Sequence, residues 1–411
     1  MRTFKELYDG LVSSALKGDF GAPQSDYDPC QLDCLLNPEK HPLVLRTGTC
    51  DCAAAKENDC VEKCPFGAIR RSDSGGIEID SGLCVGCALC VDVCDSKKLT
   101  ESTDIIPALK AVRSSKGPAY ALIAPAFLGQ FSSAVTPGKL RTALKRVGFD
   151  GMLEVALFAD ILTLKEALEF DKNIRTEKDY QLTSCCCPMW IAMIRKVYNE
   201  LMPHVPGSVS PMIACGRTVK LLHPDAVTVF IGPCLAKKAE AREKDLAGAV
   251  DYVLTFREVQ DIFGALGVDP ETMEESEKDH ASRAGRIYAR AGGVSEAVEK
   301  TVLRLNPNRP ISVRTKRADG VPACREMMNE LLAGKQDANF YEGMGCKGGC
   351  VGGPRSVTGP ERGAPLVDAY ADKSPYPTPL ENPYVIELLR RLGIDTVEAL
   401  LEETKIFTRH F

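Results

Sequence analysis

The sequence predicts an α/β protein, α+β overall, in which parallel sheets are flanked by helices and preceded by a small cysteine-rich domain. Three observations lead to this fold class. Residues 101–411 alternate short β-rich runs with helical patterns, which is typical of largely parallel sheets. Eight of the 18 cysteines lie between positions 50 and 94, which indicates a separate domain. Three later cysteine stretches each follow an apolar run, where parallel sheets place their sites.

The expected domains are an N-terminal extension at 1–45, a cysteine-rich domain at 46–100 and a larger domain at 101–411. In the larger domain, apolar β-rich runs predict strands at 120–124, 152–157, 227–231, 252–255 and 311–313. Helical patterns predict helices at 139–147, 159–170, 190–201, 211–222, 260–266, 294–305, 322–332, 382–392 and 397–407. Residues 269–283 are highly charged and lack apolar periodicity, so they predict a solvated insertion.

Composition and charge limit the classes of partner. The net charge is -5 and the pI is near 5.8, which argues against a nucleic-acid partner because such a partner calls for a basic face. No apolar stretch reaches the ~18 residues of a membrane span. The charged N-terminus lacks the apolar core of a signal peptide. We therefore expect a cytoplasmic protein with no membrane partner.

The cysteine spacing indicates iron–sulfur ligation. Disulfides belong mainly to oxidising compartments, and zinc sites favour paired Cys-x2-Cys knuckles. Neither alternative fits the run Cys84-x2-Cys87-x2-Cys90-x3-Cys94, which resembles that of a bacterial two-cluster ferredoxin.

A second, altered run lies upstream. It ends with Cys60-x3-Cys64-Pro and begins with Cys50-Asp-Cys52 in place of the usual spacing. In two-cluster ferredoxins the fourth cysteine of each run binds the other cluster. The resemblance therefore implies a ferredoxin-like domain with two 4Fe-4S clusters and crossed ligands. The first cluster would take Cys50, Cys52, Cys60 and Cys94, and the second Cys64, Cys84, Cys87 and Cys90.

Three corners in the larger domain join an apolar run to a helix or to glycines. A thiolate at a helix N-terminus is favoured by the helix dipole. Four cysteines from these corners would complete one 4Fe-4S cube, namely Cys187 (or a neighbour), Cys234, Cys346 and Cys350. Lys237 and Glu240 follow the second corner. A cation can donate to anionic ligands there, while a carboxylate can relay protons. The alternative is an exposed i, i+3 ion pair.

The corners resemble the three signature motifs of FeFe-hydrogenases, usually written TSCCPxW, MPCxxKxxE and ExMxCxxGCxxGGxP. In this chain they read Thr183-Ser-Cys-Cys-Cys-Pro-Met-Trp190, Gly232-Pro-Cys-Leu-Ala-Lys-Lys-Ala-Glu240 and Glu342-Gly-Met-Gly-Cys-Lys-Gly-Gly-Cys-Val-Gly-Gly-Pro354. The resemblance runs from about residue 118 to the C-terminus and includes stretches 291–297 and 381–384. The cysteine triplet is similar to the branch called group B.

The resemblance implies a two-lobed H-cluster domain. Its cube would be bridged by Cys350 to a two-iron subsite bearing CO, cyanide and an azadithiolate. Lys237 would donate to one cyanide, and the backbone around Pro125 and Ala126 to the other. Met344 would pack against the bridging carbonyl. A serine is common in the family where this chain has Ala126. At the second corner, glycine at position 232 replaces the expected methionine.

Proton delivery is where this chain departs most from the family. Glu166 and Glu169 match the two path glutamates, and their spacing puts both on one helical face. Glu240 is the third carboxylate expected in a proton relay. Pro206 stands where the path's serine would fall, and the path's arginine is missing. We therefore expect a rerouted path or slower proton delivery.

The cysteine triplet allows two assignments. Counting back from Pro188 makes Cys187 the cube ligand and Cys186 the thiol that passes protons. Counting forward from Thr183 instead makes Cys186 the cube ligand and Cys185 the thiol that passes protons. The first count is favoured because Pro188 suits a first helical position and fixes the helix register there.

The implied function is a hydrogenase that interconverts protons plus electrons with H2. Electrons would be exchanged with ferredoxin or a similar low-potential carrier through the accessory clusters, and maturation proteins would supply the two-iron subsite. Two alternatives stay open: an iron–sulfur scaffold or electron-transfer protein without the two-iron subsite, and an H2 sensor. Cys30 and Cys34 are expected to be unliganded, and Cys215 and Cys324 to pack as small core residues.

Overall fold

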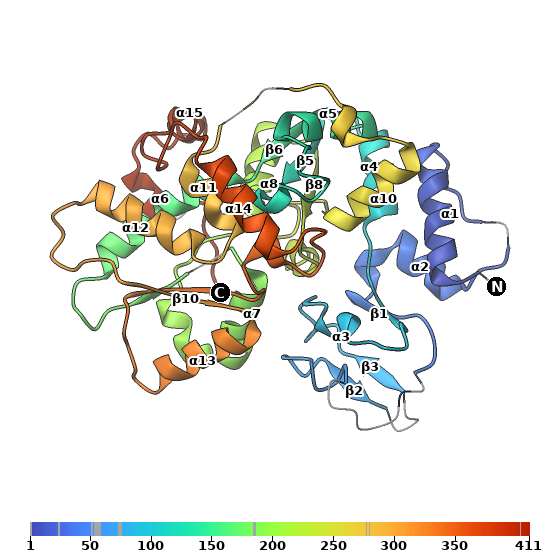
Figure 1. Cartoon of the computed structure of the whole chain (residues 1–411), viewed down its shortest axis with the longest axis horizontal. Helices are drawn as coiled ribbons and strands as arrows, with labels where there is room; N and C mark the ends of the chain where they lie inside the picture. Colours follow the sequence, from blue (N-terminus) through green and yellow to red (C-terminus); the bar gives the residue numbers. More distant parts are fainter. Residues whose placement is uncertain are drawn as a thin grey trace.

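Two parallel sheets with helices on their faces form most of the molecule (Figure 1). The computed structural model describes residues 2–23, 25–50, 52, 59–72, 76–183, 186–276, 278, 280–402 and 404–411. The larger sheet contains β5 (Ala119–Ile123), β6 (Gly151–Glu154), β8 (Val227–Gly232) and β9 (Tyr252–Thr255). Its order is β6-β5-β8-β9, and every neighbouring pair is parallel.

The smaller sheet is also parallel. It contains β7 (Gln181–Leu182), β10 (Thr315–Asp319) and β11 (Phe340–Met344), in the order β10-β11-β7. The central strand β11 is buried at every position, as expected for a parallel strand covered on both faces. The prediction of parallel sheets flanked by helices is confirmed.

The helices divide between two hydrophobic cores. They are α1 (Phe4–Leu16), α2 (Pro29–Leu36), α3 (Leu89–Asp92), α4 (Ile105–Ser114), α5 (Pro137–Val147), α6 (Ala156–Asn173), α7 (Pro188–Val197), α8 (Pro211–Leu222), α9 (Ala236–Ala241), α10 (Phe256–Leu266), α11 (Arg283–Arg286), α12 (Gly293–Leu305), α13 (Val321–Leu332), α14 (Pro360–Ala371) and α15 (Pro383–Arg391). Helices α1, α4, α5, α8 and α10 share the core of the larger sheet. Helices α7, α12 and α13 share that of the smaller sheet, and α6 contributes to both. Within the described residues, every helix is too short or too polar to span a lipid bilayer.

The cysteine-rich region contains two antiparallel strand pairs, at the lower right of Figure 1. β1 (Val44–Arg46) pairs with β4 (Leu99–Glu101), and β2 (Ile69–Arg71) pairs with β3 (Ile77–Ile79). Six of its cysteines surround a small apolar core that includes Leu235 of the larger domain. The β1–β4 pair reaches slightly beyond residues 46–100 at both ends. The division at 46–100 stays a prediction.

Two element predictions are wrong. The strand expected at 311–313 lies at Thr315–Asp319, because pairing with β11 begins only where Thr315 meets Phe340. The tail at 397–407 is not one helix. Its described residues contain only a short 3-10 turn at Glu398–Leu401, and Thr408 then pairs with Ser208.

The segment 269–283 is largely solvated up to residue 278, as expected, but its end is buried. Arg141 on α5 donates to the backbone oxygen of Lys278 at 3.1 Å. Ser282 is fully buried, and its backbone N–H donates to Asp160 on α6 at 2.7 Å. Hydrogen bonds hold the segment against α5 and α6 at these points, although its sequence shows no apolar periodicity.

Candidate metal centre

The three cysteine corners lie at the carboxyl ends of strands from both sheets. Cys187 follows β7 and immediately precedes α7, and Cys234 follows β8. Cys346 follows β11, and Cys350 begins a 3-10 turn, η6 (Cys350–Gly352). The expected placement at strand ends is therefore what the fold produces.

Backbone contacts join the corners to one another. The N–H of Gly345 donates to Cys187 Sγ at 3.3 Å, which links the first and third corners. The N–H of Arg355 donates to the oxygen of Pro233 at 3.0 Å, which links the third and second. A Cβ on Gly353 would lie 2.7 Å from Pro233 Cβ, so glycine permits this approach.

The four thiols lie within electrostatic range of one another. Burial raises the pKa of Cys234 to about 11 and that of Cys350 to about 12, and the thiol of Cys187 adds to both shifts. Burial followed by the other three thiols raises the pKa of Cys346 well above its usual value. Such thiols are protonated at neutral pH, so binding of iron would release protons.

This donor set fits a 4Fe-4S cube. A cube takes four thiolates, each on a separate iron. Within the described residues, no three His, Cys, Asp or Glu side chains converge on a point that would hold one metal ion. Between the last two cysteines, Gly348 and Gly349 have φ of +79° and +84°. A Cβ on Gly349 would lie 2.5 Å from the Ala291 nitrogen, so glycine lets this loop wrap tightly.

Lys237 and Glu240 form a buried ion pair beside these thiols. The distance from Lys237 Nζ to Glu240 Oε2 is 2.7 Å, and the two side chains are 9% and 4% exposed. Burial lowers the pKa of Lys237, but Glu240, Cys234 and Cys350 outweigh it and raise the pKa overall. The alternative of an ordinary exposed ion pair is wrong.

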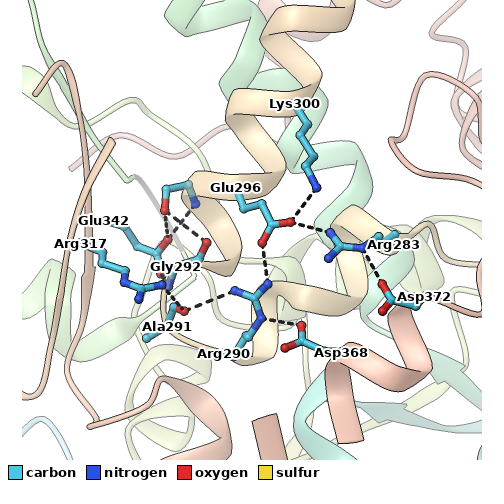
Figure 2. A network of polar contacts seen from close by, with 11 residues as sticks. Arg283, Arg290, Ala291, Gly292, Glu296, Lys300, Arg317, Glu342, Asp368 and Asp372 are labelled. Carbon is cyan, nitrogen blue, oxygen red and sulfur yellow. Dashed lines mark hydrogen bonds and ion pairs between the residues drawn. The ribbon is translucent and has the colours of Figure 1, made fainter. Parts of the chain in front are cut away.

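Glu342, the acidic residue of the third motif, anchors the strand β11 to α12 (Figure 2). Its carboxylate accepts from the N–H groups of Gly292 and Ser295, both at 2.7 Å, and from the Ser295 hydroxyl at 2.8 Å. These N–H groups at the start of α12 would otherwise lack partners, and a helix N-terminus favours negative charge. Glu342 therefore sets the position of the strand that leads into Cys346.

An ion-pair network continues along α12 (Figure 2). Glu296 pairs with three cations, namely Arg283, Arg290 and Lys300. Arg283 pairs in turn with Asp372, and Arg290 with Asp368, which lies on α14. The network joins α11, α12 and α14, and Ala291, next to Arg290, donates its N–H to Gly348 in the Cys346–Cys350 loop at 3.0 Å.

The remaining positions expected to contact the cofactor lie at the carboxyl ends of β5 and β11. A 3-10 turn, η2 (Pro125–Phe127), begins just after β5 and contacts η6. Ala126 is fully buried. Met344 ends β11 and is 1% exposed, and its backbone oxygen accepts from Gly320 at 2.8 Å. The fold thus brings Pro125, Ala126 and Met344 towards the same centre.

Two of the three carboxylates expected in the proton relay lie on α6, and the third, Glu240, lies on α9. Glu166 is 2% exposed, and Glu169 pairs with Lys165 one turn earlier. Lys165 Nζ also donates to Ser208 Oγ at 2.8 Å. A serine therefore stands beside this pair, although spacing pointed to Pro206 and no serine was expected. Counting residues along the sequence missed Ser208 because the chain turns between α7 and α8. The i, i+4 spacing of Lys165 and Glu169, by contrast, is a pattern from which their ion pair could have been predicted.

The thiols proposed for the first accessory cluster lie together. Burial raises the pKa of Cys60 to about 12, and Asp59, Cys94 and Cys50 add to the shift. The sulfur atoms of Cys52 and Cys94 lie 3.9 and 3.5 Å from the hydroxyl of Ser96. This grouping is the one that the crossed spacing implies.

The thiols proposed for the second accessory cluster lie between the first set and the larger domain. Burial raises the pKa of Cys87 to about 12, with further contributions from Cys64 and Cys84, and the same neighbours act on Cys90. Cys87 also contributes to the raised pKa of Cys346. The second set is therefore the one nearer the four-thiol centre.

Arg355 connects the cysteine-rich region to the third corner. Its side chain is 4% exposed and pairs with Asp92 on α3 at 3.0 Å and with Glu101 on β4. Its backbone already bonds to Pro233, as described above. One residue thus links a helix and a strand of the cysteine-rich region to two corners of the metal centre.

Five described cysteines stand outside these sets, and Cys185 lies outside the described residues. Cys215 and Cys324 are fully buried in the two main cores, as expected of small core residues. Cys30 is exposed on α2, and burial raises the pKa of Cys34 one turn later to about 11. Cys186 is partly buried and packs against the core of the smaller sheet.

Residues 118–354 match the family described as "Iron only hydrogenase large subunit, C-terminal domain". The chain belongs to this family. The matched range includes all three cysteine corners, so the iron–sulfur nature of the centre is supported independently of its geometry.

Individual relatives carry more than one kind of name. Iron hydrogenase 1 of Clostridium pasteurianum is 27% identical over 256 residues, which cover 53% of this chain and 45% of that protein. The chain thus spans less than half the length of that hydrogenase. A cytosolic Fe-S cluster assembly factor NAR1 of Yarrowia lipolytica is also 27% identical, over 57% of this chain and 55% of its own length. A variant of the Chlamydomonas reinhardtii FeFe-hydrogenase HydA1 superposes with a TM-score of 0.62 at 22% identity, covering 75% of this chain and 98% of that chain, which shows a shared fold.

Proposed function

We propose that the chain is an FeFe-hydrogenase that interconverts protons plus electrons with H2 at an H-cluster. The observation that carries the proposal is the buried Lys237–Glu240 pair beside four clustered thiols. A plain cube needs only its four cysteines, whereas a two-iron subsite presents anionic cyanide ligands to an ammonium group. Burial of an ion pair is costly unless further interactions compensate for it. A ligand that accepts from Lys237 supplies such an interaction.

When bound, the two-iron subsite supplies the metal chemistry of H2 formation and cleavage. The chain's own residues would hold and orient it. Lys237 would donate to one cyanide, and the backbone at Pro125 and Ala126 to the other. Met344 would pack against the bridging carbonyl, and Cys350 would link the subsite to the cube.

The accessory clusters would carry electrons between this centre and a soluble partner. We assign two 4Fe-4S clusters to a ferredoxin-like domain, with the crossed ligand sets given above. The electrostatic coupling of Cys87 and Cys346 supports electron entry through the second of them. Ferredoxin or a similar low-potential carrier is the proposed partner. Maturation proteins would insert the two-iron subsite. We assign the enzyme to group B and to the cytoplasm.

A second candidate is an iron–sulfur scaffold that holds cubes without the two-iron subsite. A relative named as a cluster assembly factor favours it. Two positions also favour it, because Ala126 lacks a hydroxyl donor and Gly232 lacks the expected methionine side chain. The buried Lys237–Glu240 pair opposes it. An H2 sensor would use the same subsite and would differ from an enzyme in turnover.

Infrared spectroscopy of the full chain tests the proposal, after loading with iron–sulfur clusters and a synthetic two-iron subsite. Bound CO and cyanide bands together with H2 turnover are expected. Bands without appreciable turnover would favour the sensor. Intact cubes without any CO or cyanide band would favour the scaffold.

A further inference from the structure

A cavity of about 510 Å³ lies where the cysteine-rich region meets the larger domain. Its walls include Val85 from the cysteine-rich region, Pro188 and Ile191 from α7, and the polar side chains of Ser208 and Glu240. A volume of this size holds on the order of ten water molecules. Water can therefore reach a wall that contains Ser208.

From Ser208 a polar chain leads into the interior. Ser208 Oγ accepts from Lys165 Nζ at 2.8 Å, and Lys165 Nζ also donates to Glu169 Oε1. Ser208 and Lys165 are 2% and 3% exposed. The second carboxylate oxygen of Glu169 is buried and has no hydrogen-bond partner within the described part of the chain. This oxygen can therefore take up or pass on a proton.

Backbone pairing holds Ser208 in place at the outer end of these polar contacts. The segment that carries Ser208 pairs with the tail, through an isolated bridge from Ser208 to Thr408 and an N–H bond from Arg409 to Gly207 at 3.1 Å. Glu166 lies three residues before Glu169 and so on the same face of α6. An apolar residue at position 165 could fill the same space without the desolvation cost of a buried ammonium. The buried charge therefore calls for a functional reason.

We propose that Lys165 relays protons between Ser208 and Glu169, and that this cavity is the solvent inlet of the route. The inference rests on the proposed hydrogenase function and names its proton supply. In the inward direction, a Lys165 N–H bond breaks as Glu169 Oε1 gains the proton. Lys165 Nζ then takes the Ser208 hydroxyl proton, and hydronium in the cavity reprotonates Ser208. During H2 uptake the same steps run in reverse.

Isotope exchange in the fully loaded enzyme isolates this step from H2 cleavage. With H2 over D2O, formation of HD and D2 requires exchange of protons with solvent, whereas conversion of para-H2 to ortho-H2 does not. Lys165→Met should slow HD and D2 formation by roughly a hundredfold, the contribution of a proton-transfer group, while para–ortho conversion persists. If the wild-type enzyme shows neither isotope exchange nor para–ortho conversion, the proposed hydrogenase function itself is wrong.

Lys165→Arg distinguishes a relay from a merely positioning residue. A guanidinium keeps the ion pair with Glu169, but its pKa lies above ~12 and it does not give up its proton. A relay predicts that Lys165→Arg exchanges as slowly as Lys165→Met. Wild-type exchange in Lys165→Arg would overturn the proposal.

Two serines provide a matched comparison of the inlet. Ser208→Ala should slow exchange like Lys165→Met. Ser210 lines the same cavity but instead caps α8 by accepting from Ile213 N–H at 3.4 Å, so Ser210→Ala should exchange at the wild-type rate. Equal rates of isotope exchange in Ser208→Ala and Ser210→Ala would show that Ser208 is not the inlet.

A second readout does not require turnover. In the chain loaded with cubes but lacking the two-iron subsite, and at a pH low enough to protonate Glu169, the infrared band of its carboxyl group can be identified by its loss in Glu169→Gln. After transfer into D2O this band should shift more slowly in Lys165→Met than in the wild type. Equal rates of shift would contradict the relay.

Discussion

Lys237 is the residue whose chemistry most directly separates a hydrogenase from a scaffold. Lys237→Met keeps the length and apolar stem of the side chain but removes the donor to cyanide. We expect the cubes to assemble and the bound CO and cyanide bands to be lost. Infrared spectra and iron content measure the two effects together.

Lys347 is the matched control for this substitution. It lies between the two cysteines of the third corner and is exposed. Lys347→Met should therefore keep both the cubes and the infrared bands. Normal CO and cyanide bands in Lys237→Met would show that Lys237 does not hold the two-iron subsite.

The cysteine triplet gives a second prediction at the residue scale. The bond from Gly345 to Cys187 Sγ favours Cys187 as the cube ligand. Cys187→Ala should lose the cube, Cys186→Ala should assemble but be nearly inactive, and Cys185→Ala should keep substantial activity. Iron content, infrared spectra and H2 assays separate these outcomes. A Cys186→Ala that loses the cube, beside an inactive Cys185→Ala with intact bands, would reverse the assignment.

Among the elements, α12 shows how a helix is held behind the metal centre. Its first turn is capped by Glu342 from β11, and its Glu296 carries the ion pairs to α11 and α14. Burial raises the pKa of Glu296, but the hydrogen bonds from Lys300, Arg290 and Arg283 outweigh it and lower the pKa to about 2. Glu296 is thus ionised over the whole physiological range.

A prediction about pH follows from this lowered pKa. The folded pKa lies below the ordinary value of 4.5, so the network stabilises the fold above about pH 4.5 and loses this effect as the pH falls towards 2. Glu296→Gln should lower the free energy of unfolding at pH 7 by about 1–2 kcal/mol after allowance for solvent screening. The difference from wild type should shrink below pH 4.5.

Urea unfolding of the metal-free chain at several pH values measures this difference. Glu299→Gln is the control, because Glu299 is exposed on the same helix. It should change stability little at any pH. A difference between Glu296→Gln and wild type that is independent of pH would contradict the ion-pair explanation.

At the scale of the whole molecule, we propose that the cysteine-rich region and the larger domain form one electron path. Arg355 connects the two parts, so the full chain is the appropriate material for counting clusters. Without the two-iron subsite it should bind about twelve irons, as three cubes of four. Cys60→Ser should remove about four irons and leave the second accessory cluster and the larger domain's cube. Retention of all twelve, or a wild-type total of only eight, would contradict the two-cluster assignment.

The sequence by itself determined the fold class and the positions of the corners, and it predicted the ligand sets. Alternating β and α patterns imply parallel sheets, and such sheets place their sites at strand ends, so Cys234 and Cys346 could be located without coordinates. Local spacing likewise predicted the crossed cysteine sets. These features depend on neighbours in sequence or on a general rule of topology, which is why patterns alone reveal them.

Only the tertiary structure decided which polar groups are buried and what they meet. Spacing left open whether Lys237 and Glu240 serve the metal centre or form an ordinary surface pair, whereas the packing of the fold buries them beside the thiols. Residue spacing predicted no serine beside α6, yet the turn before α8 brings Ser208 to Lys165. The strand predicted at 311–313 moved to Thr315–Asp319 because β11, its partner, sets the register. Burial and register depend on contacts between segments distant in the chain, and no local pattern contains them.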